Sequence, residues 1–241
     1  MTPTFFHFSE LSKDSINVEY QVHTTYTDGH ASVEEILEAA EKCHLTSIAF
    51  TEHVRRTSTD WFLGFAEKVR KEAERFPSLT VYVGCETKAL DYNGTLDVSD
   101  EILQQCDIVL GTVHSFPDGK GGYLDFGALD PTSFAEIECQ LALGLLKNAP
   151  IHVLAHPGGI FSRKCNRPYP EPLYRKMLEA SLEREIAIEI NSSYLIDFEG
   201  FLNLCSEFNP VVSIGSDVHR LEEVGKCRDI LNQYSHKIFN G

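Results

Sequence analysis

The stretch Tyr20-Gln-Val-His-Thr-Thr-Tyr-Thr-Asp-Gly29 joins a strand-like run of residues to a polar turn. Residues 16–22 alternate between apolar and polar side chains, which predicts a strand that carries His23 at its carboxyl end. Ser32 is a residue type that caps helices, and two glutamates follow it, so a helix is predicted over residues 32–43. The stretch therefore predicts a strand, a turn and a helix in succession.

The same arrangement, a short apolar run that ends near a histidine or an acidic residue, recurs along the chain. The later runs lead into Thr51-Glu-His53, Gly84-Cys-Glu86, Thr112-Val-His114, Ala155-His-Pro157 and Ser216-Asp-Val-His219. In a barrel of parallel strands, polar residues at the carboxyl ends of the strands gather into one site. We therefore expect these motifs to converge on the turn after His23.

Strands and helices are predicted to alternate along the whole chain. Further strands are predicted at residues 46–50, 79–83, 108–113, 151–155, 186–190 and 211–215, and helices at residues 61–76, 101–105, 132–147, 172–184, 201–208 and 222–234. No linker interrupts the pattern, so we predict one α/β barrel domain over residues 1–241. A doubly wound open sheet is the alternative, but it would bring fewer strand ends together.

Three segments are less well determined by the pattern. Residues before Lys13 include three phenylalanines, and they are expected to form either a packed arm or a frayed end. The segment from Asn93 to Gly94 predicts a turn within residues 90–99. The glycine-rich residues 117–122 lack the strand-then-helix setting of a phosphate-binding loop, so a plain or lid loop is expected.

Composition places the chain among ordinary soluble proteins. It has 241 residues, of which 42% are hydrophobic and 24% are charged. No apolar run approaches the roughly 20 residues of a membrane span, and residues 1–14 lack the pattern of a secretory signal. The seven cysteines are scattered without a CxxC pair, which favours reduced thiols and a cytoplasmic location.

The formal net charge of −15 argues against long nucleic acid as a partner, because such binding relies on many Lys and Arg contacts. It does not exclude a small phosphorylated substrate. Bound divalent cations would reverse the local field in the site.

Five histidines lie at or just beyond predicted strand ends, together with two acidic residues. They are His23, His53, His114, His156 and His219, with Glu86 and Asp217. His7, His44, His152 and His236 are expected to have structural or surface roles. Imidazoles and carboxylates suit Zn, Fe and Mn ions, and paired ions can bind the attacking and departing oxygens of a phosphoryl displacement. The set therefore predicts metal-assisted hydrolysis of a phosphate ester.

These motifs in combination resemble those of the PHP (polymerase and histidinol phosphatase) family of metal-dependent phosphoesterases. The resemblance covers His-Thr-x-x-Thr-Asp-Gly at 23–29 and the later motifs, from about Tyr20 to Val224. It implies a distorted seven-stranded (β/α)7 TIM-like barrel, which agrees with the seven strands predicted independently.

The resemblance also implies a set of ligands for two or three divalent ions, Mn, Zn or Fe. One ion would bind His23, Glu86 and Asp217. Glu86 would bridge to a second ion held by His114 and His156, and a third would bind His53 and His219 with Asp28 or His30 nearby. Glu86, His114 and Asp217 would act in catalysis through a hydroxide bridging two ions.

The chain departs from the family pattern at three places. Gln21 replaces the first histidine of the usual His-x-His motif, so that metal site is expected to bind weakly or to favour Mn. The PHP domain of bacterial family X DNA polymerases is similar, including a Gln here and the residues around 94–97. Glu52 replaces the commoner Asp and is expected to orient His53. His30 is one residue later than a ligand of some members.

Several residues are candidates for contacting the substrate. Arginines suit phosphate oxygens, and Arg55, Arg163 and Arg220 follow predicted ligands along the chain. Asn191 follows the sixth predicted strand and is a further candidate. The expected substrate is a small phosphate monoester such as L-histidinol phosphate.

Three other functions remain open from the residues. One is a nuclease-like phosphodiesterase acting on nucleotides or short oligonucleotides. Another is a metal-binding but inactive regulatory module, which Gln21 favours. An amidohydrolase-like C–N hydrolase is disfavoured, because such enzymes commonly carry an intact His-x-His and a carboxylated lysine.

Overall fold

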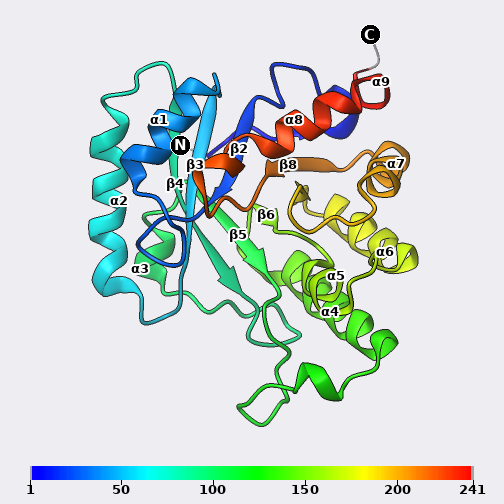
Figure 1. Ribbon diagram of the computed structural model, residues 1–241. Coiled ribbons are helices and arrows are strands. Elements are labelled where there is room, and N and C mark those ends of the chain that lie inside the picture. Colours follow the sequence, from blue (N-terminus) through cyan, green and yellow to red (C-terminus); the bar gives the residue numbers. More distant parts are fainter. Residues whose placement is uncertain (1, 240–241) are drawn as a thin grey trace.

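The computed structural model describes residues 2–239 and is built around an eight-stranded sheet (Figure 1). The strands are β1 (Phe6–His7), β2 (Val18–Val22), β3 (Ser47–His53), β4 (Thr80–Lys88), β5 (Ile108–Thr112), β6 (Val153–Leu154), β7 (Ala187–Asn191) and β8 (Val211–Gly215). Strands β2 to β8 pair in parallel in chain order, and β1 adds to β8 in the antiparallel sense.

The two ends of the parallel series come together and give the sheet the form of a distorted barrel. Val22, the last residue of β2, forms an isolated parallel bridge with Val218, which follows β8. The backbone N–H of His23 donates to the Val218 carbonyl at 2.8 Å, and the Val218 N–H donates to the Gln21 carbonyl at 3.0 Å. The strand ladder itself is not continuous between β2 and β8. The predicted seven-stranded barrel is therefore confirmed in distorted form.

Helices surround this sheet, with α1 and α2 on one side in Figure 1 and α4 to α7 on the other. The helices of four or more residues are α1 (Val33–Lys42), α2 (Thr59–Ala73), α3 (Asp100–Leu103), α4 (Pro131–Asn148), α5 (Gly159–Cys165), α6 (Glu171–Leu182), α7 (Phe198–Phe208), α8 (Lys226–Gln233) and α9 (Ser235–Ile238). Three short 3-10 turns complete the described elements: η1 (Phe8–Glu10), η2 (Phe126–Ala128) and η3 (Leu221–Glu223).

Local sequence explains where the helices begin. Ser32 caps α1 and forms a capping box with Glu35, as its sequence predicts. Asp130 accepts hydrogen bonds from the first turn of α4, where Pro131 has no N–H group that needs an acceptor. Because helices cover the outside of the sheet, strands such as β5 and β7 are buried along their whole length.

Several predicted element boundaries were wrong or incomplete. Of the two alternatives for the amino-terminal arm, the structure has the packed one: the arm supplies β1, and the His7 ring nitrogen Nδ1 lies 3.0 Å from the Asn209 carbonyl oxygen. The segment after His156, where no helix was predicted, contains α5. Strand β4 continues five residues beyond Val83 and ends at Lys88, so Glu86 lies within the strand. The last predicted helix is divided into η3 and α8.

Candidate metal centre

The predicted ligands converge at the carboxyl ends of the barrel strands. His23 directly follows β2, His53 ends β3, and Glu86 lies near the end of β4. The remaining ligands follow their strands by two to four residues: His114 after β5, His156 after β6, and Asp217 and His219 after β8. Parallel strands end at one face of the sheet, so residues far apart in sequence meet there.

Glu86 is the centre of the group. Its Oε1 lies 2.9 Å from Nε2 of His156 and 3.2 Å from Nε2 of His114. Its Oε2 lies 3.2 Å from Nε2 of His23 and 3.2 Å from Nδ1 of His53. Each carboxylate oxygen therefore faces two imidazoles, an arrangement in which one carboxylate could bridge two ions.

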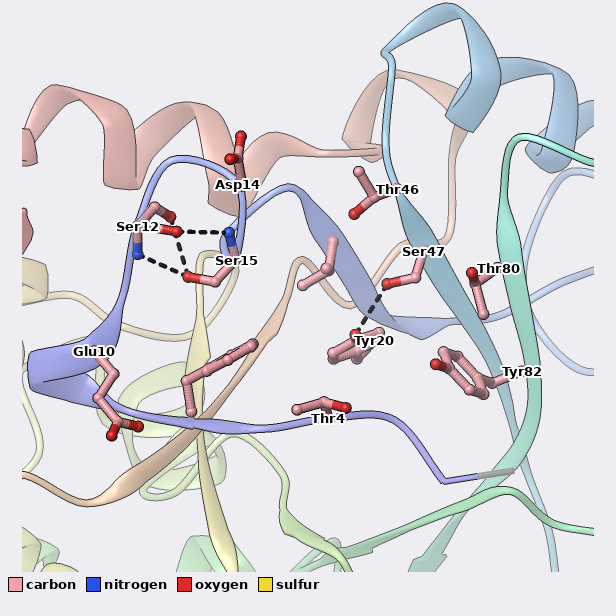
Figure 2. Close-up of a pocket in the computed structure, with 12 residues that line it drawn as sticks. Thr4, Glu10, Ser12, Asp14, Ser15, Tyr20, Thr46, Ser47, Thr80 and Tyr82 are labelled. Atoms are coloured by element: carbon pink, nitrogen blue, oxygen red, sulfur yellow. Dashed lines mark hydrogen bonds between the residues drawn. The ribbon is translucent and has the colours of Figure 1, made fainter.

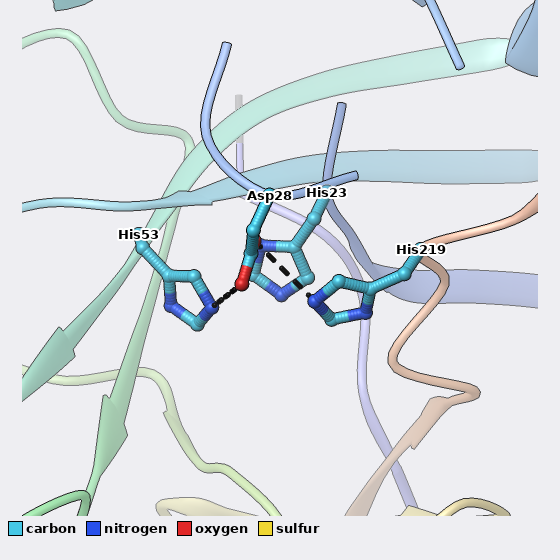
Figure 3. A group of neighbouring side chains, drawn as sticks. All are labelled: His23, Asp28, His53 and His219. Carbon is cyan, nitrogen blue, oxygen red and sulfur yellow. Dashed lines mark ion pairs between the residues drawn. The ribbon is translucent and has the colours of Figure 1, made fainter. Parts of the chain in front are cut away.

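A second cluster lies beside Glu86 and is shared by the turn after β2 and the segment after β8 (Figure 3). The Asp28 carboxylate points between two rings, with Oδ2 3.5 Å from His53 Nε2 and Oδ1 3.4 Å from His219 Nε2. The His23 ring stacks against His53 with 4.2 Å between ring centroids. His23, Asp28, His53 and His219 could together hold one ion.

Two more sets of ligand atoms lie close enough together to hold an ion. One set is His53, Glu86 and His114, and the other is His23, Glu86 and Asp217. His23 Nε2 lies 3.2 Å from Asp217 Oδ1. His156 is outside these sets but contacts Glu86 directly. The three-ion arrangement implied by the family resemblance thus has its residues in one place.

Buried atoms without hydrogen-bond partners show that the residues fit metal ions. Both ring nitrogens of His23 and Oε2 of Glu86 are buried and make no hydrogen bond among residues 2–239, because the 3.2 Å contacts of His23 Nε2 with Glu86 and Asp217 lack hydrogen-bond geometry. Leaving such atoms unsatisfied is costly unless something else binds them. Their donor atoms, imidazole nitrogen and carboxylate oxygen, suit Zn, Fe or Mn.

The carboxylates of the centre are held in the anionic form. Burial raises the pKa of the Glu86 carboxyl, but the imidazoles of His53 and His114 outweigh it and lower this pKa well below its ordinary value. Burial likewise opposes ionisation of Asp217, yet the adjacent His23 lowers its pKa to about 2. Hydrogen bonds to His219 and His53 lower the pKa of Asp28. Negative charge is thus available for divalent cations.

Two of the candidate ligands have unusual backbone angles, and a buried carboxylate supports one of them. His156 and Asp217 have φ angles of +28° and +53°, which are uncommon for residues with a side chain. The His156 N–H donates to Oε2 of Glu189 at 2.6 Å, and Glu189 is fully buried. Burial raises the pKa of Glu189 to about 7. A buried residue outside the ligand set therefore fixes the turn that carries His156.

The cleft above the ligands has two parts, which share His53 and His114. The part that we call the Arg163 lobe has a volume of about 350 Å³ and is lined by Asp28, His219, Phe126, Ile160, Arg163, Lys164 and Tyr194 besides the shared pair. The part that we call the Lys88 lobe has a volume of about 390 Å³ and is lined by Val54, Arg55, Glu86, Lys88 and Ser115 besides the same pair.

Arg163, a predicted substrate residue, forms the end of a stack of side chains in its lobe. Its guanidinium carbon lies 4.5 Å from the centroid of the Tyr194 ring, and this ring stacks on His156 at 4.3 Å. Two hydrogen bonds anchor the helix that carries Arg163, because the N–H groups of Ile160 and Phe161 donate to the buried carboxylate of Glu138 at 3.1 and 2.9 Å. The guanidinium is thus oriented beside the ligands.

Of the other predicted site residues, only Arg55 lines the cleft. Gln21 is fully buried, and its Oε1 accepts a 2.8 Å hydrogen bond from Asn191, which is also fully buried. Neither Gln21 nor Asn191 lines a lobe of the cleft. Arg220 does not line one either, while Arg55 lines the Lys88 lobe. The His30 side chain is exposed and belongs to none of the three ligand sets.

The expected role of Glu52 was wrong. Its Oε1 accepts hydrogen bonds from the N–H and the hydroxyl of Thr24, at 2.8 and 2.5 Å, and its Oε2 accepts one from the hydroxyl of Thr27. It therefore fixes the turn that carries Asp28 and does not orient His53. Neighbouring residues of a strand point to opposite faces, a signal that was already present in the sequence.

Sequence reasoning missed Lys88, Ser115 and Tyr194. Lys88 lies two residues after Glu86 in β4, so the alternation of a strand turns both side chains to the same face. That signal was hidden by the early predicted end of the strand. No sequence pattern identified Tyr194, which follows Asn191 in a loop.

A separate groove of about 460 Å³ lies at the opposite, amino-terminal ends of β2, β3 and β4 (Figure 2). Its lining includes the hydroxyls of Ser12, Ser15, Ser47 and Thr80 and no His, Lys or Arg among the described residues. Within it, the Tyr20 and Ser47 hydroxyls are hydrogen-bonded at 2.9 Å. This groove is remote from the imidazoles and is not the candidate centre.

Residues 19–193 match the PHP domain family. The chain belongs to the PHP family. A protein of Caldicellulosiruptor bescii named "probable phosphatase" is 27% identical to this PHP chain, covering 88% of the chain and 83% of the relative. A protein of the same name from Acetivibrio thermocellus is 26% identical to this chain, and the match covers 85% of this chain and 80% of the relative. The family resemblance of the motifs is therefore confirmed.

A solved structure shares the fold of this PHP chain. It is a presumed histidinol phosphatase from Listeria monocytogenes, with a TM-score of 0.72 and 17% sequence identity, covering 87% of this chain and 97% of that one. At that identity the likeness concerns the fold. Among residues 2–239, no helix has both the length and the apolar character that a membrane span requires.

Proposed function

We propose that this PHP chain hydrolyses small phosphate monoesters, with two or three divalent ions, Mn, Zn or Fe, held around Glu86. The observation that carries the proposal is the position of Glu86, whose two carboxylate oxygens each face two imidazoles in a cleft that cationic side chains also line. The phosphatase names of the relatives and the fold of the Listeria protein support the same class of reaction.

The candidate ligands fall into the three sets given by the geometry, with His156 beside Glu86. When bound, such ions lower the pKa of water and stabilise charge on the attacking and departing oxygens of a phosphoryl group. Glu86, His114 and Asp217 would contribute to catalysis by holding them. No nucleophilic side chain is needed.

Arg163 has the role of holding the phosphoryl group. In the described part of the chain its guanidinium forms no ion pair, and its face is covered by Tyr194, which leaves the N–H edge for phosphate oxygens. Its lobe also contacts Asp28, His53, His114 and His219, so a phosphoryl group there would lie next to four candidate ligands. Phe126, Ile160 and Tyr194 provide apolar walls that limit access of bulk water.

The roles of Asn191 and Arg220 remain predictions, and the proposed role of Asn191 differs from the one predicted from the sequence. Because Asn191 donates to Gln21 and is buried, we assign it to positioning Gln21 beneath the centre. Arg220 remains a candidate for substrate contact only from its sequence position. The free state of all seven cysteines supports the proposed cytoplasmic location.

Hydrolysis assays with defined metals test the proposal. The protein, freed of metal and reloaded with Mn, Zn or Fe, is assayed with p-nitrophenyl phosphate, bis-p-nitrophenyl phosphate and L-histidinol phosphate. We expect turnover of monoesters and its loss in His114→Ala. Turnover of the diester alone would contradict the proposal in favour of a nuclease-like enzyme, and bound metal without any turnover would favour a binding module.

A further inference from the structure

The Lys88 lobe has a different chemical character from the Arg163 lobe. It shares only His53 and His114 with that lobe, and its remaining lining is polar or charged except for Val54. If the phosphoryl group lies beside Arg163 and the ligands, the rest of the substrate can extend past His53 and His114 into the Lys88 lobe. The Lys88 lobe is then available to the leaving group.

Lys88 has hydrogen-bonding capacity left for a ligand. Its Nζ lies 2.9 Å from the Tyr123 hydroxyl and 4.7 Å from the centroid of the same ring. Lys88 also forms an ion pair with Asp97, but at 3.9 Å this contact is too long for a hydrogen bond. An ammonium has three donors, and only one is used here. The side chain is only 16% exposed, so an unused donor gains more from a ligand than it would in open solvent.

Two further groups in the lobe lack partners. The Ser115 hydroxyl oxygen is buried and has no hydrogen bond among residues 2–239. Arg55 is exposed, and its guanidinium forms no ion pair or hydrogen bond within the same residues, although the Arg55 backbone N–H is fixed by the Ser58 hydroxyl at 3.0 Å. The lobe also contains the Glu86 carboxylate, whose charge bound ions would offset. Beside it, an ammonium, a guanidinium and an unpaired hydroxyl line the same lobe. Oxygen atoms of an anion would satisfy all three.

We propose that the Lys88 lobe is an anion-binding subsite for the leaving group, so that the preferred substrate is a phosphate monoester with a second anionic group, a carboxylate or a phosphate. This inference rests on the proposed monoesterase activity. It also ranks the esters: L-histidinol phosphate carries an ammonium on its leaving group, which Lys88 and Arg55 repel, so anionic esters are better substrates.

The segment after β5 contacts this subsite through Tyr123, which bonds to Lys88. Tyr123 lies at the end of the glycine-rich residues 117–122, which fold back through a bridge between Pro117 and Tyr123. Figure 1 shows the chain after β5 projecting beyond the strand ends. Tyr123 is 51% exposed, and its hydroxyl occupies one donor of Lys88. The anion of the leaving group takes the donors that Tyr123 does not use.

A matched series of esters tests the subsite. The metal-loaded protein is assayed with phenyl phosphate, 4-carboxyphenyl phosphate, 4-(aminomethyl)phenyl phosphate and hydroquinone bisphosphate, which place a neutral, carboxylate, ammonium or phosphate group at the same position. The readout is the ratio of kcat/KM for each charged ester to that for phenyl phosphate. We expect at least about a tenfold advantage for an anionic ester, as for a hydrogen bond to a charged group.

The variant Lys88→Gln distinguishes the effect of the subsite from the intrinsic reactivity of each ester. Because the same esters are compared in both proteins, electronic differences between leaving groups cancel in the change of the ratio. We expect the anionic advantage to fall about tenfold in Lys88→Gln. Lys42→Gln is the control, since Lys42 is 77% exposed and pairs only with Glu38 on α1 among the described residues. The better of the two anionic esters identifies carboxylate or phosphate as the second group.

Binding provides a readout that does not depend on turnover. Calorimetric titration with benzylphosphonate and 4-carboxybenzylphosphonate measures the same preference without hydrolysis. Turnover with no anionic preference, or with a preference that Lys88→Gln leaves unchanged, overturns the subsite while the monoesterase stands. If no ester is hydrolysed, the proposed function fails, and the phosphonate affinities in the two proteins still decide for or against the subsite.

Discussion

The carboxylate of Glu189 accepts a 2.6 Å hydrogen bond from the backbone N–H of His156. This contact joins β7 to the turn after β6 and holds His156 in a backbone conformation that residues with side chains rarely adopt. The same carboxylate oxygen accepts a 3.1 Å hydrogen bond from Asn191. The imidazole next to Glu86 is therefore positioned by a residue that itself lies outside the ligand sets.

The space around Glu189 predicts the effect of a glycine substitution. A Cβ atom at Gly215 would collide with the Glu189 carboxylate, which has no room to move because Glu189 is fully buried. We expect Gly215→Ala to lower the free energy of unfolding by about 1–3 kcal/mol, the usual cost of overpacking. Denaturant unfolding measures this value.

Gly64→Ala is the matched control for that substitution. Gly64 lies in α2, and no atom lies within 4 Å of the Cβ that the substitution would add. Replacing a helical glycine there is expected to raise stability by up to about 1 kcal/mol. Equal effects of the two substitutions would contradict the packing described around Glu189.

The buried carboxyl of Glu138 predicts a pH dependence of stability. Burial raises its pKa from 4.5 to about 7, although the N–H groups of Phe161 and Ile160 oppose the shift. The folded chain thus binds this proton more tightly than the unfolded chain. The stabilising contribution is complete below pH 4.5 and is lost as the pH rises through about 7.

Replacing Glu138 by glutamine measures this contribution. Glutamine cannot ionise but keeps an oxygen that can accept from the first turn of α5. Across the interval from pH 4.5 to 7, we expect the wild-type protein to lose about 3 kcal/mol more unfolding free energy than Glu138→Gln. Chemical unfolding at several pH values provides the comparison, and parallel pH profiles of the two proteins would refute the assignment.

Arg163 is expected to affect substrate binding through its position on Tyr194. Removing the guanidinium in Arg163→Gln deletes charge-assisted hydrogen bonds to the phosphoryl group, so kcat/KM for p-nitrophenyl phosphate should fall by about tenfold or more. Arg167→Gln is the control, because Arg167 is exposed and lines a different groove. A comparable loss in both variants would indicate a general charge effect and not a phosphate contact.

Most residues of the candidate centre could be predicted from the sequence, because each is marked by the residues next to it in the chain. Each ligand follows a short apolar run, and parallel strands place their carboxyl ends on one face, so His23, His53, His114 and His156 could be assigned without knowledge of distant contacts. The capping residue Ser32 was predictable for the same reason.

The remainder depends on contacts between distant residues. Strand β1 has two residues and is defined by its pairing with β8, about 200 positions later. The role of Glu189 follows from the approach of β7 to the His156 turn, which no pattern in either segment indicates. Lys88 became part of the cleft because β4 extends further than its apolar run, with β3 and β5 on either side to pair with it.

Metal stoichiometry tests the central claim about Glu86 most directly. Elemental analysis of the protein loaded with Mn, Zn or Fe is compared between wild type and Glu86→Gln, with Glu74→Gln on the exposed surface as control and circular dichroism to verify folding. We predict at least two ions per wild-type chain and the loss of at least one in Glu86→Gln, because a carboxylate that faces four imidazoles bridges ions. A folded wild-type protein that binds no metal under any condition, or an unchanged stoichiometry in folded Glu86→Gln, would contradict the account.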